Sequence, residues 1–163
     1  MRRWISLLFG FLMLMPVLAL AKGAVWSESS ERIELAGEID YWAETDGPAS
    51  LDSVVALDDS EWQSDGGESI SFGYSDTVYW FRFRMANETD VPRPLYLEIA
   101  YAVLDRIEFY MFEDGSLIES QLLGDKLPFN ERLIPHRNFL IPLTLPPDES
   151  RMVFMRVDTT SSM

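Results

Sequence analysis

Six short stretches between residues 77 and 158 read as β-strands, most of them because apolar and polar side chains alternate along them. They are residues 77–86, 95–101, 106–112, 117–123, 139–145 and 151–158. A period of two places one set of side chains on each face of a strand. Turn residues separate the stretches, and Asp114-Gly115 is a strong hairpin signal. The pattern predicts an all-β fold of antiparallel strands.

The segment before residue 70 carries weaker signals. Residues 38–42 are consistent with one more short strand, and residues 51–57 with a short helix or strand capped by Asp52. Residues 124–138 show no periodicity and are expected to form a long loop. Seven or more short strands without a long helix predict an antiparallel β-sandwich of the jelly-roll type.

The N-terminal residues 1–21 read as a secretory signal peptide that forms a helix. Two arginines precede an apolar run from Trp4 to Leu20, and Ala19-Leu20-Ala21 matches a cleavage site of small residues. The alternative is an uncleaved membrane anchor, although the run is near the lower length limit for spanning a bilayer. The cleavage pattern favours export.

The remainder of the chain is expected to form a single domain. We assign residues 22–34 to a flexible mature N-terminus and residues 35–163 to the sandwich. About 140 residues suffice for one compact core. Because the sequence stops at Met163, directly after a strand, we expect the final strand of the sandwich to be missing.

The chain is strongly acidic and contains no cysteine. Without Arg2 and Arg3, which leave with the signal peptide, 11 basic residues face 27 acidic ones, a net charge of −16. Such a charge argues against nucleic acid as a partner. The lack of cysteine excludes a disulfide scaffold and thiol or iron–sulfur chemistry. Export without disulfides favours the bacterial periplasm.

No residue pattern points to catalysis. His136 is the single histidine and lies in the long loop, and no G-x-S-x-G motif is present. Asp58, Asp59 and Glu61 are close together but lack the spacing of a calcium loop. We therefore expect a protein that is not an enzyme, with no catalytic residues, no metal site and no cofactor.

The stretch YWFRFRM, residues 79–85, raises the main functional question. One side of this strand is apolar and is predicted to face the core; it consists of Tyr79, Phe81, Phe83 and Met85. The other side carries Trp80, Arg82 and Arg84. In one interpretation this is an ordinary outer face, whose arginines pair with Glu98 or Glu108 on neighbouring strands.

In the other interpretation the second face binds a ligand. Sugar sites combine flat aromatic rings with charged hydrogen-bonding groups. Tyr96, Tyr110 and Phe112 also fall on the second faces of their strands. Trp80 would stack on the ligand, Arg82 and Arg84 would donate hydrogen bonds, and the long loop with His136 would rim the site. The candidate ligand-binding set is Trp80, Arg82, Arg84, Glu98, Arg132 and Arg137.

Several motifs occur in an order that points to a family. They are Tyr79-Trp80-Phe81-Arg82-Phe83, Asn87, Leu97-Glu98-Ile99, the run from Leu104 to Tyr110, the run from Gly124 to Phe129, Arg132 and Arg156-Val157. From about Leu35 to its end, the chain resembles the type 2 extracellular domain of bacterial seven-transmembrane receptors with diverse intracellular signalling modules (7TMR-DISM). No single motif is specific, but the ordered set is.

The resemblance implies a periplasmic jelly roll similar to carbohydrate-binding modules. In such receptors seven membrane helices and a cytoplasmic output module follow, so the full-length protein is membrane-associated. The implied function is sensing a small polar ligand, with a carbohydrate as the expected class. Two alternatives stay open: a protein-interaction sandwich, and a freestanding carbohydrate-binding or adhesion module.

Overall fold

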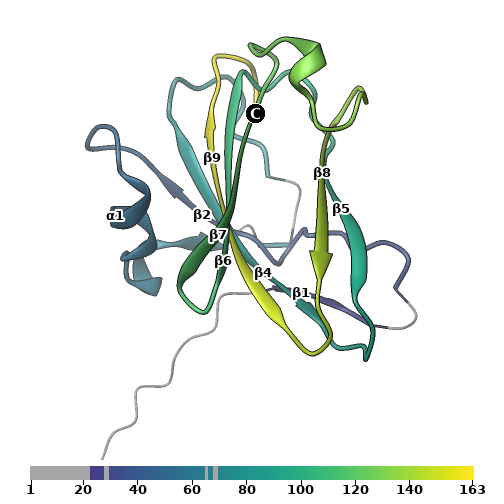
Figure 1. Cartoon of the computed structure of the whole chain (residues 1–163). Coiled ribbons are helices and arrows are strands. Elements are labelled where there is room, and N and C mark those ends of the chain that lie inside the picture. The colour runs from purple at the N-terminus through teal and green to yellow at the C-terminus, as the bar shows by residue number, and fades with distance from the viewer. Residues whose placement is uncertain (1–22, 28–29, 65, 68–69) are drawn as a thin grey trace, which may run out of the picture.

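The computed structural model describes residues 23–27, 30–64, 66–67 and 70–163, so the predicted signal peptide lies outside the described residues. Two β-sheets face each other (Figure 1). The larger has the order β3-β2-β4-β9-β6-β7, with β1 also pairing β4, and the smaller is β5-β8. The strands are β1 (Gly23–Trp26), β2 (Asp40–Ala43), β3 (Gln63–Ser64), β4 (Tyr79–Asn87), β5 (Arg93–Ile99), β6 (Arg106–Glu113), β7 (Ser116–Leu123), β8 (Phe139–Leu145) and β9 (Ser150–Asp158).

The predicted antiparallel sandwich is confirmed. Strands β4 to β9 begin and end within two residues of the stretches expected from alternation. The chain crosses between the sheets from β4 to β5, from β5 to β6, from β7 to β8 and from β8 to β9. Every pairing is antiparallel except that of β1 with β4. Strands β1 and β3 were not predicted.

The core lies between the sheets, where the alternating strands turn their apolar sides toward each other. The predicted inner face of β4 is confirmed, because Phe81, Phe83 and Met85 are buried and Tyr79 packs against them. The facing strands supply Leu97, Phe139, Ile141, Leu143 and Leu145. Burying a side chain of this size stabilises a fold by roughly 1.5–3 kcal/mol. Burial of these inner-face side chains therefore determines which face of β4 points outward.

The predicted hairpin joins β6 to β7. Asp114 and Gly115 both have positive φ, 46° and 78°, which is the conformation of a two-residue type I′ turn. Aspartate and glycine are among the residues that adopt this conformation most readily. The hairpin places Phe112 near the tip, next to the first residues of β9, as the pairing of Phe112 with Met152 shows.

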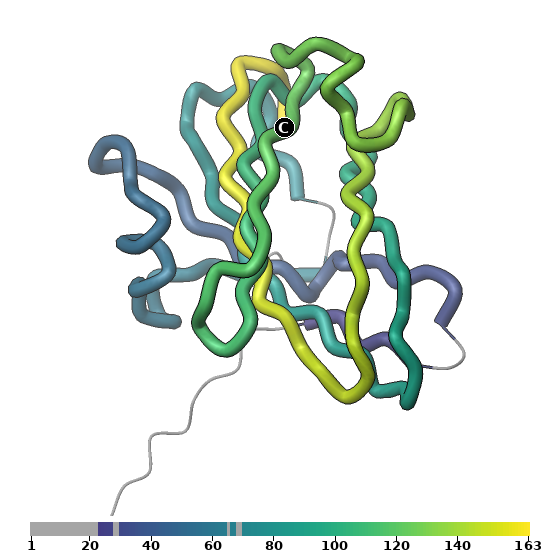
Figure 2. The backbone as a smooth tube through the Cα atoms, in the orientation of Figure 1, coloured from purple at the N-terminus to yellow at the C-terminus, as the bar shows by residue number. Residues whose placement is uncertain are grey.

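A third layer covers part of the outer face of the larger sheet. Residues 44–62 lie on the side opposite β5 and β8 and include α1 (Leu51–Val55) and the 3-10 turn η1 (Asp59–Glu61) (Figure 2). The α1 cap is Ser50, whose hydroxyl accepts the Ser53 N–H at 3.2 Å, so the prediction of Asp52 as the cap is wrong by two positions. Among the described residues, no helix has the length and hydropathy to cross a membrane.

A second hydrophobic cluster forms beneath this cover. It consists of Val54 and Trp62 from the cover and Trp80 and Phe154 from β4 and β9. The rings of Trp62 and Phe154 lie 6.0 Å apart between centroids. The outer face of the sheet is therefore a second core over part of its area, which limits where a ligand can reach it.

Candidate functional site

The second faces of β4, β9 and β6 form three rows of side chains across the larger sheet. Strand register sets their composition, because directly paired residues point to the same face. The first row is Trp80, Arg156 and Glu108; the second row is Arg82, Phe154 and Tyr110; the third row is Arg84, Met152 and Phe112. The structure thus brings Trp80, Arg82 and Arg84 onto one face, as alternation predicted.

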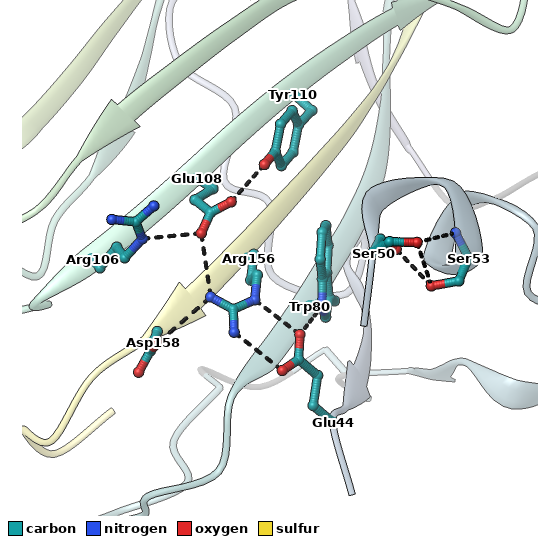
Figure 3. Close-up of polar contacts among 9 residues, drawn as sticks. All are labelled: Glu44, Ser50, Ser53, Trp80, Arg106, Glu108, Tyr110, Arg156 and Asp158. Carbon is teal, nitrogen blue, oxygen red and sulfur yellow. Dashed lines mark hydrogen bonds and ion pairs between the residues drawn. The ribbon is translucent and has the colours of Figure 1, made fainter. Parts of the chain in front are cut away.

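The first row is a closed ionic network (Figure 3). Arg156 donates from Nε to Glu44 Oε1 at 2.9 Å and from Nη2 to Oε2 at 3.2 Å. Trp80 donates its indole N–H to Glu44 Oε1 at 2.6 Å. On the other side, Arg156 Nη1 reaches Glu108 Oε1 at 3.3 Å, which Arg106 also contacts at 3.0 Å. Trp80 is buried, so its ring is not open to a stacking ligand in this conformation.

Electrostatics hold the network in its charged form. Burial of Glu44 opposes its ionisation, but hydrogen bonds from Arg156 and Trp80 outweigh burial and lower its pKa. The same balance lowers the pKa of Glu108, where burial is outweighed by hydrogen bonds from Tyr110 and Arg106. The hydrogen bond to Glu44 outweighs burial at Arg156 and raises its pKa. Each partner thus favours the ionised form of the next.

Tyr110 ends this network in the neighbouring second row. Its hydroxyl donates to Glu108 Oε2 at 2.6 Å, and its ring stacks on Trp80 with 6.1 Å between centroids. Burial, followed by the hydrogen bond to the Glu108 carboxylate, raises the pKa of Tyr110 to about 12. The phenol therefore stays protonated in the folded chain at pH values where it ionises in the unfolded chain.

This shift predicts a loss of stability at alkaline pH. The folded state keeps a proton that the unfolded state releases above the ordinary pKa of 10.0, so the free energy of unfolding falls between pH 10 and about 12. Tyr110→Phe is expected to flatten that decline, measured by urea unfolding at stepped pH. The exposed Tyr74→Phe is the matched control. Equal slopes for wild type and Tyr110→Phe would contradict the assignment.

The second row is covered and its arginine is fully engaged. Arg82 contacts Asp40 at 3.1 Å and Asp59 at 2.8 Å, and its guanidinium lies 4.5 Å from the ring centroid of Trp62. The expected pairing of Arg82 or Arg84 with Glu98 or Glu108 is wrong. The reason is that β4 lies between β2 and β9, while Glu98 belongs to the other sheet.

The third row remains open. It lines a cavity of about 410 Å³. The walls come from β4, β6, the β6–β7 turn and β9, together with one residue of α1. Its lining is Val55, Arg84, Phe112, Asp114, Gly115, Ser150, Arg151, Met152 and Phe154. Among the described residues, no carboxylate lies within ion-pair distance of Arg84, whereas Arg151 is held by Glu113 and Glu149. An arginine without an acidic partner is notable in a chain of net charge −14.

The remaining predicted site residues lie away from this face. Glu98 is exposed on β5 and accepts a hydrogen bond from Asn138 at 2.6 Å. Arg132 donates to the carbonyls of His136 and Arg137, both at 2.8 Å, and so braces the long loop. Arg137 is exposed on the same loop. The structure does not bring these residues to Trp80, Arg82 or Arg84, and their binding roles stay predictions.

Sequence reasoning did not find Met152 and Val55 as neighbours of Arg84. Alternation along residues 151–158 places Met152 with Phe154 and Arg156 on one face. No sequence signal indicated that β9 would lie beside β4, because the two strands are about 70 residues apart in the chain. Phe112 was recognised as a second-face aromatic residue, but its place beside Arg84 follows only from the pairing of β6 with β9.

A larger concavity lies on the other side of the sheet. It is a groove of about 910 Å³ between β5 and residues 31–36, and most of its lining is apolar. Glu98 is on its rim. Within the described part of the chain, no group of three or more histidine or acidic side chains is arranged to hold a metal ion.

A family model described as 7TMR-DISM extracellular 2 matches residues 36–163. The matched range runs from just before β2 to Met163 and includes strands β2 to β9, whereas β1 precedes it. No curated protein matches the chain.

Proposed function

Because the chain belongs to the 7TMR-DISM extracellular 2 family, whose members are extracellular domains of receptors, we propose that it is the ligand-sensing domain of a bacterial membrane receptor. In this proposal it works in the periplasm, and the receptor passes the signal through membrane helices to a cytoplasmic output module. In this proposal the domain binds a ligand and catalyses no reaction, in keeping with a family of receptor extracellular domains.

The ligand binds in the third-row cavity, and the free guanidinium of Arg84 is the observation that carries this proposal. Guanidinium groups donate several hydrogen bonds in a fixed plane and suit hydroxyl-rich or carboxylate ligands. Phe112 offers a ring beside Arg84, and Ser150 and Asp114 offer oxygen acceptors. This combination fits the chemistry of sugar recognition. We propose a carbohydrate, with sugar acids preferred because a carboxylate pairs with Arg84.

The other two rows are less suited to the same ligand. Trp80 is bonded to Glu44, and Arg82 is bonded to Asp40 and Asp59, so a ligand would have to displace existing ion pairs. Arg84 has no such competitor among the described residues. The cavity also joins Val55 of α1 to the sheet. A bound ligand would therefore bridge the cover and the β6–β7 hairpin, which offers a route from binding to a change in shape.

Calorimetric titration with paired sugars tests the proposal. Glucose and galactose are compared with glucuronate and galacturonate, and the uronates are expected to bind more tightly, with affinity that falls as salt rises. Arg84→Met is expected to weaken uronate binding about 10- to 100-fold, because a charge-assisted hydrogen bond is lost. Arg32→Met is the matched control, because this arginine side chain is 71% exposed and does not line the third-row cavity. No binding by any sugar, or equal binding by Arg84→Met, would contradict the proposal.

A further inference from the structure

The smaller sheet has a free edge. Within the part of the chain that the structure describes, strand β5 pairs with β8 on one side and with no strand on the other. Pro94 lies opposite Thr144, and Pro142 lies opposite Tyr96. The two prolines therefore both belong to the same set of every second residue pair along β5 and β8. Proline has no N–H, and these pairs therefore take the positions whose backbone groups point away from the partner strand. Tyr96 and Glu98 belong to this same set of pairs, so their backbone N–H and C=O groups point toward the free edge.

The groove of about 910 Å³ runs along this edge. Leu95 and Ile99 of β5 line it, its floor includes Phe81 and Met155 of the larger sheet, and residues 31–36 form part of its other side. Among the described residues, no hydrogen bond from residues 31–36 reaches β5. The free edge and the apolar floor together match what an added strand needs: backbone hydrogen bonds from one side and pockets for alternate side chains.

The rim of the groove is acidic. Glu31, Glu34 and Glu98 line it, and the one basic residue of the lining, Arg32, contacts Glu34 at 2.8 Å. Basic side chains on a bound segment would therefore meet carboxylates along the rim. A second copy of this chain is a poor occupant, because two chains of net charge −14 repel each other.

We propose that the β5 edge and this groove are the docking site for an extended segment of a partner protein, in which apolar and basic side chains alternate. The segment adds to β5 as a third strand of the smaller sheet. Its apolar side chains enter the groove, its basic side chains lie over Glu98 and the rim, and its backbone bonds to Tyr96 and Glu98. This site is separate from the Arg84 cavity and does not rest on it.

Methylated peptides test this docking mode. The probe is a capped peptide of seven residues, the length of β5, with alternating valine and lysine. In antiparallel addition, residues facing Tyr96 and Glu98 point outward, so the lysine amides bond to β5. N-methylation of the lysine amides is expected to weaken binding roughly tenfold or more, while N-methylation of the valine amides has little effect. Both probes carry the same charge, so equal affinities would overturn the proposal.

A substitution at the edge provides the complementary test. Tyr96→Pro removes one outward N–H but no hydrogen bond to β8, and is expected to keep the fold, as judged by circular dichroism, while weakening peptide binding roughly tenfold. Tyr96→Thr loses the same exposed ring but keeps the N–H, and is expected to bind as wild type. Equal peptide affinity for the two variants would overturn the proposal. So would concentration-dependent dimerisation, measured by sedimentation, that Tyr96→Pro abolishes.

Discussion

Replacing Glu44 with alanine is expected to lower the free energy of unfolding by about 3–5 kcal/mol. The Glu44 side chain is only 4% exposed, and its two oxygens accept from Arg156 and from the indole of Trp80. Removing it leaves the Nε–H and Nη2–H groups of Arg156 and the indole N–H of Trp80 without their acceptor under the cover formed by residues 44–62. Arg156 then keeps only the longer contacts of Nη1 with Glu108 at 3.3 Å and Asp158 at 3.6 Å. A buried charge that loses its partner costs more than the pair itself contributes.

The measurement is urea unfolding of wild type and Glu44→Ala at neutral pH. The matched control is Glu34→Ala, which breaks an arginine–glutamate contact of 2.8 Å whose side chains are more than 70% exposed; it is expected to change stability by less than about 1 kcal/mol. Because the pKa of Glu44 is lowered, its contribution is present above pH 4.5 and is lost as the pH falls below that value. A similar effect of both substitutions would contradict the assignment.

A double substitution separates the ion pair from simple loss of packing. Arg156→Met in the Glu44→Ala background removes the cation that has lost its closest carboxylate partner, and the double variant is expected to be more stable than Glu44→Ala alone. Strictly additive losses would instead mean that Glu44 and Arg156 act independently.

Replacing Trp80 with alanine is expected to lower the free energy of unfolding by about 3–5 kcal/mol. Trp80 is 1% exposed and packs in the second hydrophobic cluster with Val54, Trp62 and Phe154. The substitution empties a large volume beneath α1 and also removes one donor to Glu44. Thermal and urea unfolding give the measurement, and Tyr96→Ala, at a position 66% exposed, is the control, with a change within about 0.5 kcal/mol expected.

Trp80→Phe refines this prediction. Phenylalanine keeps an aromatic ring in the cluster but has no N–H for Glu44, so the loss is expected to be smaller than for alanine. A Trp80→Ala variant with the stability of wild type but no sugar binding would contradict the structural role argued here. That result would favour the stacking role that the sequence predicted for Trp80.

The strands of this fold were predictable because their side chains alternate. Phe81, Phe83 and Met85 are buried as the period of two indicated, and Asp114-Gly115 forms the expected turn. Strands β1 and β3 were not predictable, because each is short and lacks alternation. Strand β1 also requires a glycine where its backbone lies close to that of β4, because a Cβ atom at Gly23 would lie 2.6 Å from the Arg84 carbonyl oxygen. That requirement is visible only once the two strands are placed together.

The candidate site was predictable only in part. Alternation correctly placed Trp80, Arg82 and Arg84 on one face, but it could not indicate that residues 44–62 cover the first two of them. The cover depends on contacts over long sequence distances, such as Glu44 with Arg156, which are separated by 112 positions. The acidic segment between residues 40 and 59 thus supplies carboxylate partners for Arg82 and Arg156 of the sheet.

A nuclear magnetic resonance titration with glucuronate tests the central claim most directly. The probes are the side-chain N–H signals of Arg84, Arg82 and Trp80, which report the open third row and the two closed rows separately. We expect saturable shifts of the Arg84 Nε–H signal, with the Trp80 indole signal unmoved because its N–H stays bonded to Glu44. Shifts confined to Trp80 and Arg82, or no shift of any of the three signals at saturating glucuronate, would contradict the account.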